Sequence, residues 1–416
     1  MRANSFTPRR RSLRVALALG LASVLTLAGC SGGGDQGGGE SGETVKIGLP
    51  HPLTGAWSDG GQNAVNGAML AIEDINEAGG LEGLDGAMLE GVEADTGSTD
   101  PGQAATVTRQ LIERDEVSAL VGSYVSGFTT TASTEAEKAG VPMISQSYSD
   151  ELSDRGYQYF FQLPPTASAL GSTVVPYVQE AYAAVGIDIK RVAVLASNDA
   201  SIQGQGEAAI QQSQDAGLEV VYDNFYPQDL SDATVMVQAT LDAEPDAIFL
   251  GGPTGAAVAI IQAIRSLGFD GPIVGLGGGG ILTPQFGELL GDDVNGILSQ
   301  AAWNWDLPFE GLEDVAAEYS ERFDSTFMPQ EAGESYVAVW VLAEAMNSAG
   351  SADAEAIAEV LRSTEFDSGH AAQMPGGTVK FDDIGLNEKV FPIMIQWQEG
   401  TTRTVWPQDV QVVEPQ

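Results

Sequence analysis

The chain has 416 residues, with 58 acidic against 18 basic side chains and a formal net charge of −40 at pH 7. A surface this acidic repels nucleic acid and anionic lipid headgroups, so the composition excludes nucleic acid as a partner. Hydrophobic residues make up 43% of the chain, which is typical of a folded protein, and the length suits two domains that each have a sizeable core.

The N-terminus has the features of an export signal. Five arginines and no acid precede the uncharged run 15–29, which is shorter than the ~20 apolar residues that span a bilayer. Leu27-Ala28-Gly29-Cys30 resembles the lipobox of bacterial lipoproteins. We therefore expect residues 1–29 to be a signal peptide and Cys30 to be the lipidated first residue of the mature protein. The alternative is an ordinary signal peptide with an incidental cysteine.

A single cysteine fits an anchor better than a structural role. Exported proteins normally pair cysteines in disulfides, and Cys30 is alone, so the core must hold the fold. Residues 30–43 are rich in glycine and serine and are predicted to form a flexible tether. Without the signal, 13 basic and 58 acidic residues remain, a net charge of −45. We interpret these acids as a solvated surface rather than an acidic binding patch.

From Thr44 onward, short apolar strands alternate with amphipathic helices. Strands are predicted at TVKIGL, VSALVG, VPMIS, RVAVLA, DAIFL and PIVGL. Apolar residues at helical spacing over 65–75 predict a helix that ends at Gly79-Gly80, Asp100-Pro101 begins the next, and another is predicted over 128–138. This alternation predicts an α/β fold with parallel sheets covered on both faces.

The middle of the chain indicates a second copy of this arrangement. SALVGSYVSG and AIFLGGPTGA both read as strand, glycine, short loop and helix. We therefore predict two doubly wound lobes. A predicted strand in YQYFFQL ends at Pro164-Pro165, where the chain can cross from one lobe to the other.

The sequence gives little support for an enzyme. Two histidines exclude a three-histidine zinc site, the one cysteine at the lipobox excludes a catalytic thiol, and no HExxH, GxSxG or Walker A motif occurs. Gly275, Gly277 and Gly280 in GLGGGG satisfy GxGxxG, but Thr283-Pro284 delays the helix that should follow. We interpret this stretch as a supple loop beside a cleft. No catalytic residue, cofactor or metal site is predicted.

Hydroxyl side chains follow two successive strands. SYVSG comes after ALVG, and QSYS comes after PMIS. Ligands of open parallel sheets bind at the carboxyl ends of strands, and helix N-termini attract anions, so these loops predict a site for a carboxylate. Taken alone, Ser126 is more simply read as a helix N-cap. Two serine-rich strand ends close in sequence favour a binding site.

Four stretches together resemble the Leu/Ile/Val-binding proteins: GLPHPLTGAWSDGGQNAVNGAMLAIEDINEAGG, DPGQAATVTRQLI, ALVGSYVSGFTTTAS and GVPMISQSYSDELSDRGYQYFFQL. These are ABC-transporter substrate-binding proteins of the branched-chain amino-acid type, with the type I periplasmic-binding fold. The resemblance covers nearly all of 44–406. It implies two doubly wound parallel-sheet lobes that are joined by three crossovers and close on a small solute. It places 44–163 with 301–385 in lobe 1, and 164–300 with 386–416 in lobe 2.

By position, the resemblance also implies how an anionic group is held. Ser126 would hydrogen-bond the ligand carboxylate. Ser147 would offer backbone groups, and Ser149 would offer its hydroxyl and N–H.

For the rest of the ligand, the resemblance implies that Trp57 packs on an apolar part. Gln203 lies where amino-acid binders often have an aromatic residue, and Thr254 lies on a second-lobe loop that faces the cleft. Amino-acid binders of this family carry an acid near Gly277, and this chain has glycine there. A buried ammonium needs a counter-charge, which Glu331 could supply from the other lobe. Glu331 could equally be a solvated acid at a helix start, and without an acid a carboxylic acid, amide or urea-like ligand becomes plausible.

The resemblance implies a receptor that carries a small amino acid or a related carboxylate or amide to an ABC permease. Lipid on Cys30 would anchor it to the outer face of the cell membrane, or in the periplasm. One alternative is a sensory receptor on the same fold that signals to a membrane kinase or chemoreceptor. Another is an envelope enzyme that uses Asp and Glu as acid and base.

Overall fold

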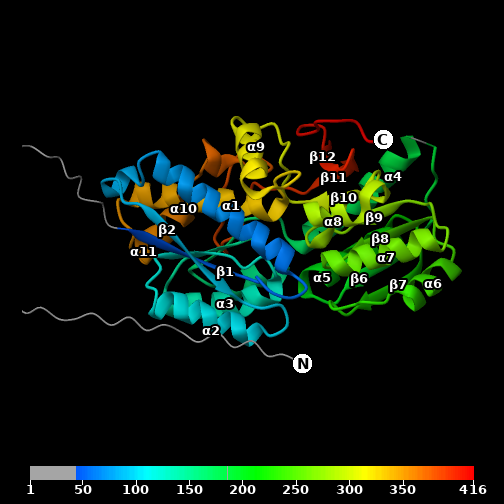
Figure 1. Cartoon of the computed structure of the whole chain (residues 1–416), viewed down its shortest axis with the longest axis horizontal. Helices are drawn as coiled ribbons and strands as arrows, with labels where there is room; N and C mark the ends of the chain where they lie inside the picture. The colour runs from blue at the N-terminus through cyan, green and yellow to red at the C-terminus, as the bar shows by residue number, and fades with distance from the viewer. Residues whose placement is uncertain (1–43, 185) are drawn as a thin grey trace, which may run out of the picture. The chain divides into compact units, whose positions relative to one another are not determined.

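The computed structural model describes residues 44–184 and 186–416, which form two mainly parallel sheets covered by helices (Figure 1). The predicted lipobox and tether lie outside the described residues. We call the part built on the first sheet lobe 1 and the part built on the second sheet lobe 2. The α/β fold with two doubly wound sheets, predicted from the alternating pattern, is confirmed.

The first sheet has five parallel strands in the order β2-β1-β3-β4-β5. The strands are β1 Val45–His51, β2 Leu89–Asp95, β3 Ala119–Val121, β4 Met143–Ser145 and β5 Phe160–Gln162. The helices of this lobe are α1 Ser58–Glu77, α2 Pro101–Glu113, α3 Ser126–Ala139, α9 Leu312–Phe323, α10 Gln330–Ala349 and α11 Ala354–Ser363. Helices α1 and α10 pack together on one face, and α2 and α3 pack together on the other (Figure 1).

The second sheet has seven strands in the order β12-β11-β10-β9-β8-β6-β7. The strands are β6 Arg191–Ser197, β7 Glu219–Tyr226, β8 Ala247–Gly251, β9 Ile273–Gly275, β10 Leu298–Ala301, β11 Ile393–Gln398 and β12 Thr401–Trp406. Only the last hairpin departs from parallel pairing, since β11 is antiparallel to both β10 and β12. The helices are α4 Ala167–Ala184, α5 Ala200–Asp215, α6 Thr234–Asp242, α7 Thr254–Ser266 and α8 Pro284–Leu290.

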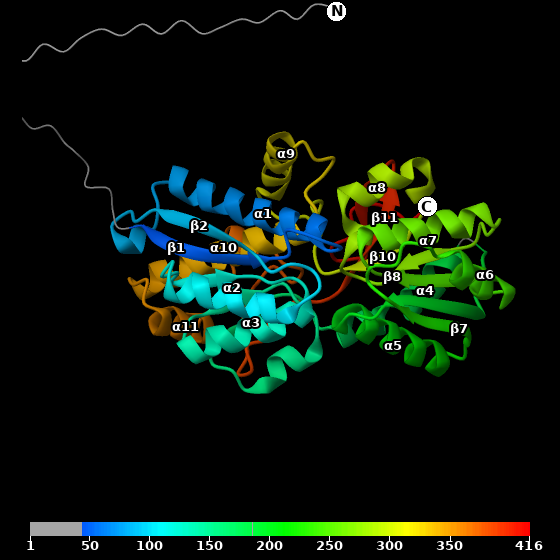
Figure 2. The same cartoon turned by 60° about the horizontal axis from the view of Figure 1, so that its bottom comes forward.

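The apolar runs of lobe 2 are buried on both faces because successive strand side chains point to opposite sides. Ala193, Leu195 and Ile248 join the core cluster that contains α7. Val194 and Phe249 join the cluster that contains α4 and α5. Figure 2 shows α7 and α5 on opposite sides of these strands. Each strand therefore supplies two cores, which explains its continuous hydrophobic sequence.

Local sequence signals determine where the helices around the site begin. The Asp100 side chain accepts a hydrogen bond from Gly102 N at the start of α2, with Pro101 in the first helical position, as predicted. The helix after the glycine run is delayed, as predicted. This helix, α8, begins only at Pro284 and is capped by Thr283. Helix α3 begins at Ser126, two residues before the predicted range 128–138.

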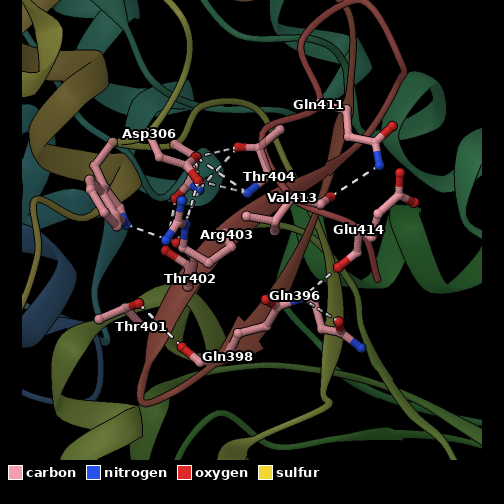
Figure 3. A network of polar contacts seen from close by, with 12 residues as sticks. Asp306, Gln396, Gln398, Thr401, Thr402, Arg403, Thr404, Gln411, Val413 and Glu414 are labelled. Atoms are coloured by element: carbon pink, nitrogen blue, oxygen red, sulfur yellow. Dashed lines mark hydrogen bonds and ion pairs between the residues drawn. The ribbon is translucent and has the colours of Figure 1, made fainter. Parts of the chain in front are cut away.

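The chain passes between the sheets three times: after β5, after β10 and before β11. A polar network ties the segment after β10 to the C-terminal hairpin (Figure 3). The buried carboxylate of Asp306 accepts hydrogen bonds from Thr404 N and Thr404 Oγ1 and pairs with Arg403 Nε at 2.9 Å. These bonds hold the crossing segment after β10 against β12 of lobe 2. The exact lobe boundaries stay a prediction.

Candidate ligand-binding site

A small cavity lies where the carboxyl ends of strands from both sheets meet. It encloses about 20 Å³, room for about one water molecule. Its wall is formed by loops after β1, β3, β4, β6 and β9, and consists of Trp57, Tyr124, Val125, Ser126, Tyr148, Asp199, Ser201, Ile202, Gly278 and Gly279. A wider groove of about 460 Å³ shares Val125 and Asp199 with the cavity. The cavity occupies the position at which open parallel sheets bind ligands.

Ser126 is the first residue of α3 and is 1% exposed. Its Oγ accepts a hydrogen bond from Ser149 N at 3.2 Å, so the two serine-rich loops meet as predicted. The N-cap of α3 is Val125, and its side chain makes no capping bond. The interpretation of Ser126 as a mere helix cap is therefore wrong. Its hydroxyl and the first turn of α3 face a cavity, where they can hold an anionic oxygen.

Trp57 bridges the two lobes. Its buried indole lines the cavity, and Nε1 donates to Gln228 Oε1 at 2.7 Å. Gln228 lies just after β7 of lobe 2. Tyr124 Oη donates to the Trp57 carbonyl at 2.8 Å, and the two rings meet edge to face at 6.1 Å. The position of Trp57 is thus fixed by contacts from both lobes.

Of the seven residues expected near the ligand, five do not line the cavity: Ser147, Ser149, Gln203, Thr254 and Glu331. Ser147 is buried, and its Oγ is bonded to the carbonyl of Ser123 and to Thr129 Oγ1. Gln203, on α5, donates to Glu207. Thr254 begins α7, and its Oγ1 lies 3.3 Å from that of Thr283. The structure brings Trp57 and Ser126 together in one cavity, with Ser149 one hydrogen bond away.

Glu331 is buried in the first turn of α10 and is 2% exposed. Among the groups that the structure describes, neither carboxylate oxygen has a hydrogen-bond partner. Burial raises the pKa of Glu331 to about 7, and the charge of Asp59 acts in the same direction. Glu331 does not line the cavity, but it lies close to the wall. After burial itself, its charge is the largest cause that raises the pKa of Tyr124.

Glu334, one turn further along α10, stands behind Tyr148. Its Oε1 accepts a hydrogen bond from Tyr148 Oη at 2.9 Å. Burial, followed by the charge of Glu331, raises the pKa of Glu334 well above its usual value. The interpretation of Glu331 as a solvated acid is wrong, because α10 is buried along most of its length.

Asp199, the acid that lines the cavity from lobe 2, was not predicted from the sequence. It caps α5, with Oδ1 accepting from Ile202 N at 3.0 Å and Oδ2 from Ser197 Oγ at 2.5 Å. Burial raises the pKa of Asp199. The sequence did contain a signal for Asp199, because this acid follows β6 in the same way as the predicted serines follow β3 and β4. Tyr124, two residues before Ser126, and Tyr148, between Ser147 and Ser149, were also missed.

The glycine run after β9 has no room for the acid that amino-acid binders carry there. A Cβ at Gly277 would lie 2.9 Å from the carbonyl oxygen of Gln300. At Gly278, where φ is +83°, it would lie 2.7 Å from the Tyr148 ring, and at Gly279 it would lie 3.1 Å from the Trp57 ring. Lobe 1 aromatics therefore cover this loop of lobe 2 closely. Any counter-charge for a cationic ligand must come from elsewhere.

Among residues 44–184 and 186–416, no group of three or more His, Cys, Asp or Glu residues is placed to hold a metal ion. Two parallel sheets whose strand ends enclose a cavity between them define a two-lobed solute-binding protein. A family model described as "Periplasmic binding protein" matches residues 44–390. The chain belongs to this family, as its motifs predicted. It is a family of binding proteins and not of enzymes.

Similar proteins support the same class. Leu/Ile/Val-binding protein homolog 7 of Brucella abortus is 28% identical over 383 residues, covering 89% of this chain and 93% of that protein. The branched-chain amino acid transporter substrate binding protein LivJ of Streptococcus pneumoniae, solved with isoleucine, has a TM-score of 0.76 and 25% identity, covering 88% of this chain and all of that one.

The same fold occurs with another kind of ligand. A solute binding protein of an ABC transporter from Rhodopseudomonas palustris was solved with 3,4-dihydroxy benzoic acid. It has a TM-score of 0.71 and 20% identity to this chain, covering 86% of this chain and 95% of that one.

Proposed function

We propose that this protein is the lipid-anchored receptor of an ABC importer and that it holds an amino acid, or a related carboxylate or amide, between its lobes. The observation that carries this proposal is the cavity at the strand ends, with Ser126 on one wall and Trp57 bridging to lobe 2. Members of the periplasmic binding protein family work outside the cytoplasm, which supports this location. The ligand would be passed to a permease in the membrane.

The carboxylate end of the ligand belongs at the meeting point of α3 and the loop after β4. Ser149 N and Ser126 Oγ already pair there at 3.2 Å. An anionic oxygen can take over the Ser149 N–H and accept from the Ser126 hydroxyl, which donates more strongly to a charged group than to a neutral one. The first turn of α3 adds the positive end of its dipole. Trp57 would then cover the apolar part of the ligand.

The ammonium end, if the ligand has one, needs a negative partner. Glu331 is buried, and among the described groups its oxygens have no hydrogen-bond partner, so it gains most from a nearby positive charge. The effect of its charge on Tyr124, which lines the cavity, supports this role. Glu331 would act as the counter-charge that the glycine at position 277 does not provide.

The membrane attachment rests on Cys30, which lies outside the described residues. Within the described residues, no helix combines the length and the apolar composition that crossing a bilayer requires. We propose that lipid on Cys30 holds the protein at the outer face of the cell membrane. The glycine-rich tether would give the lobes freedom to reach the permease.

Ser126→Ala is expected to weaken ligand binding by about ten- to a hundred-fold, because a hydrogen bond to a charged group contributes ~1.5–3 kcal/mol. The free energy of unfolding of the empty protein should fall by only ~1 kcal/mol, because the Ser149 N–H loses its hydroxyl acceptor while the helix keeps its start at Val125. Calorimetric titration with the L-amino acids, beginning with isoleucine, and thermal melts of the same samples measure both effects.

The matched control is Ser213→Ala, which removes another buried serine hydroxyl, bonded to Ala209 O far from the cavity. It should leave affinity unchanged and lower the free energy of unfolding by ~1 kcal/mol. Unchanged affinity in Ser126→Ala would remove this residue from the site.

A further inference from the structure

The wall of the cavity combines three aromatic rings with one carboxylate. Trp57, Tyr124 and Tyr148 supply the rings, and Asp199 supplies the charge. In the part of the chain that the structure describes, no Lys, Arg or His lines this cavity. Aromatic faces and carboxylates both attract positive charge. The wall is therefore suited to a cation in addition to the carboxylate that the serines can hold.

The polar atoms of all three rings are already used within the protein. Trp57 Nε1 donates to Gln228, and Tyr124 Oη donates to the Trp57 carbonyl. Tyr148 Oη donates to Glu334 and accepts from Gln330 Nε2 at 2.7 Å. The rings therefore offer a ligand their carbon surfaces rather than their hydrogen-bonding atoms.

The rings are also held firmly. Trp57 and Tyr124 brace each other edge to face, and the Trp57 and Tyr148 rings lie against Gly279 and Gly278 of lobe 2. These contacts restrict each ring to one placement when the lobes are together. A preorganised aromatic surface loses little freedom when it binds a cation.

The acid that lines the cavity supplies charge more readily than free hydrogen-bond acceptors. Both oxygens of Asp199 already accept hydrogen bonds, from Ile202 N and Ser197 Oγ. Glu331 stands behind the wall rather than in it. A primary ammonium has three N–H groups that each need an acceptor, whereas an alkylated ammonium needs only nearby negative charge and a surface to cover its methyl groups. The wall matches the second kind of cation better.

We propose that the ligand carries an alkylated ammonium group that lies against Trp57, Tyr124 and Tyr148, and that Asp199, which lines the cavity, shares the role of counter-charge with Glu331. The inference rests on the proposed function and narrows it to N-alkylated amino acids, betaines among them. The carboxylate stays at Ser126 and Ser149. Glu331 adds negative potential from lobe 1.

The test is calorimetric titration of the mature protein with glycine, alanine and valine, and with the N,N,N-trimethyl derivative (the betaine) of each. A further probe is 3,3-dimethylbutanoate, in which an uncharged tert-butyl group replaces the trimethylammonium of glycine betaine. The inference holds if at least one betaine binds as tightly as its parent amino acid or more tightly, and if the uncharged analogue binds at least about tenfold more weakly than glycine betaine.

Other outcomes overturn it in distinguishable ways. If parent amino acids bind and every betaine binds more weakly than its parent, the ammonium N–H groups are needed, and the proposed function stands without this inference. If the uncharged analogue binds as well as glycine betaine, the site takes a carboxylate alone. If no compound binds in either series, or among the other amino acids, both the inference and the proposed function are wrong.

Variants at Trp57 separate a cation site from simple apolar cover. Trp57→Leu should weaken the betaine about tenfold and the uncharged analogue far less, while Trp57→Phe, which keeps a ring, should retain most of the betaine affinity. Trp340→Leu is the control, since Trp340 lies on α10 beside His370 and does not line the cavity. Equal losses for the charged and uncharged ligands in Trp57→Leu would show that the ring only covers apolar surface.

Discussion

Cys30→Ser is expected to move all of the protein from the membrane fraction to the soluble fraction or the medium, or to leave it unprocessed with residues 1–29 attached. Each buried CH₂ of an acyl chain contributes ~0.8 kcal/mol to membrane binding, so the loss of several chains leaves nothing to hold an acidic protein at the bilayer. Membrane fractionation, with mass spectrometry of the N-terminus, measures both results.

Ser31→Ala is the matched control, because it changes a neighbouring small residue and leaves the thiol in place. It should remain in the membrane fraction and carry lipid. A Cys30→Ser protein that has lost its signal and still stays in the membrane fraction would rule out a lipid anchor at this position.

Glu331→Gln is expected to make the free energy of unfolding much less dependent on pH. The pKa of Glu331 is about 7 in the folded protein, against an ordinary value of 4.5 that applies when the chain is unfolded. Between these values the folded state holds a proton that the unfolded state releases. The stability from this group is therefore complete below pH 4.5 and is lost as the pH rises through 7.

The size of this loss is about 3 kcal/mol, since one unit of pKa corresponds to ~1.4 kcal/mol. Urea unfolding of the empty protein at pH 5 and pH 8 measures it. Between pH 5 and pH 8, the free energy of unfolding of wild type should fall by about 3 kcal/mol more than that of the variant. Asp59 and Glu334, which act on Glu331 electrostatically, are present in both proteins, so the difference between the two curves reports Glu331.

Glu321→Gln serves as the control, because it changes an exposed glutamate on α9. Its unfolding curves should follow those of wild type. Parallel pH dependence in wild type and Glu331→Gln would mean that Glu331 is solvated and charged in the folded protein. A cationic ligand favours the charged form of Glu331, so its affinity should also rise between pH 6 and pH 8 in wild type and less in the variant.

The sequence predicted the fold well because its signals are local. Apolar runs between glycines defined the strands, and Asp100-Pro101 marked the start of α2 within one residue. The meeting of Ser126 and Ser149 was also predictable, since both follow neighbouring parallel strands and such strand ends lie at one edge of a sheet.

Contacts between distant segments could not be predicted in the same way. Trp57 and Gln228 are 171 positions apart, and Tyr148 and Glu334 are 186 apart. Nothing in either local pattern indicates the partner. The burial of Glu331 was also hidden, because an acid at a helix start normally faces water. Only the packing of α10 against α1 and the first sheet removes it from solvent.

Position within a family motif proved a weaker guide to individual side chains. Ser147 and Gln203 lie next in the chain to residues that line the cavity, yet their side chains bond to neighbours elsewhere. One residue along a loop or helix turns a side chain away from a cleft. Asp199 shows the reverse, since it was not predicted from the sequence and yet lines the cavity.

The most direct test of a solute held between the lobes is mass spectrometry of the small molecules released when purified wild type and Ser126→Ala are denatured side by side. We expect one solute with a carboxylate or amide group from wild type, in an amount close to that of the protein, and less than about a tenth as much from the variant. Equal recovery from the two proteins, or a solute with neither group, would contradict the account.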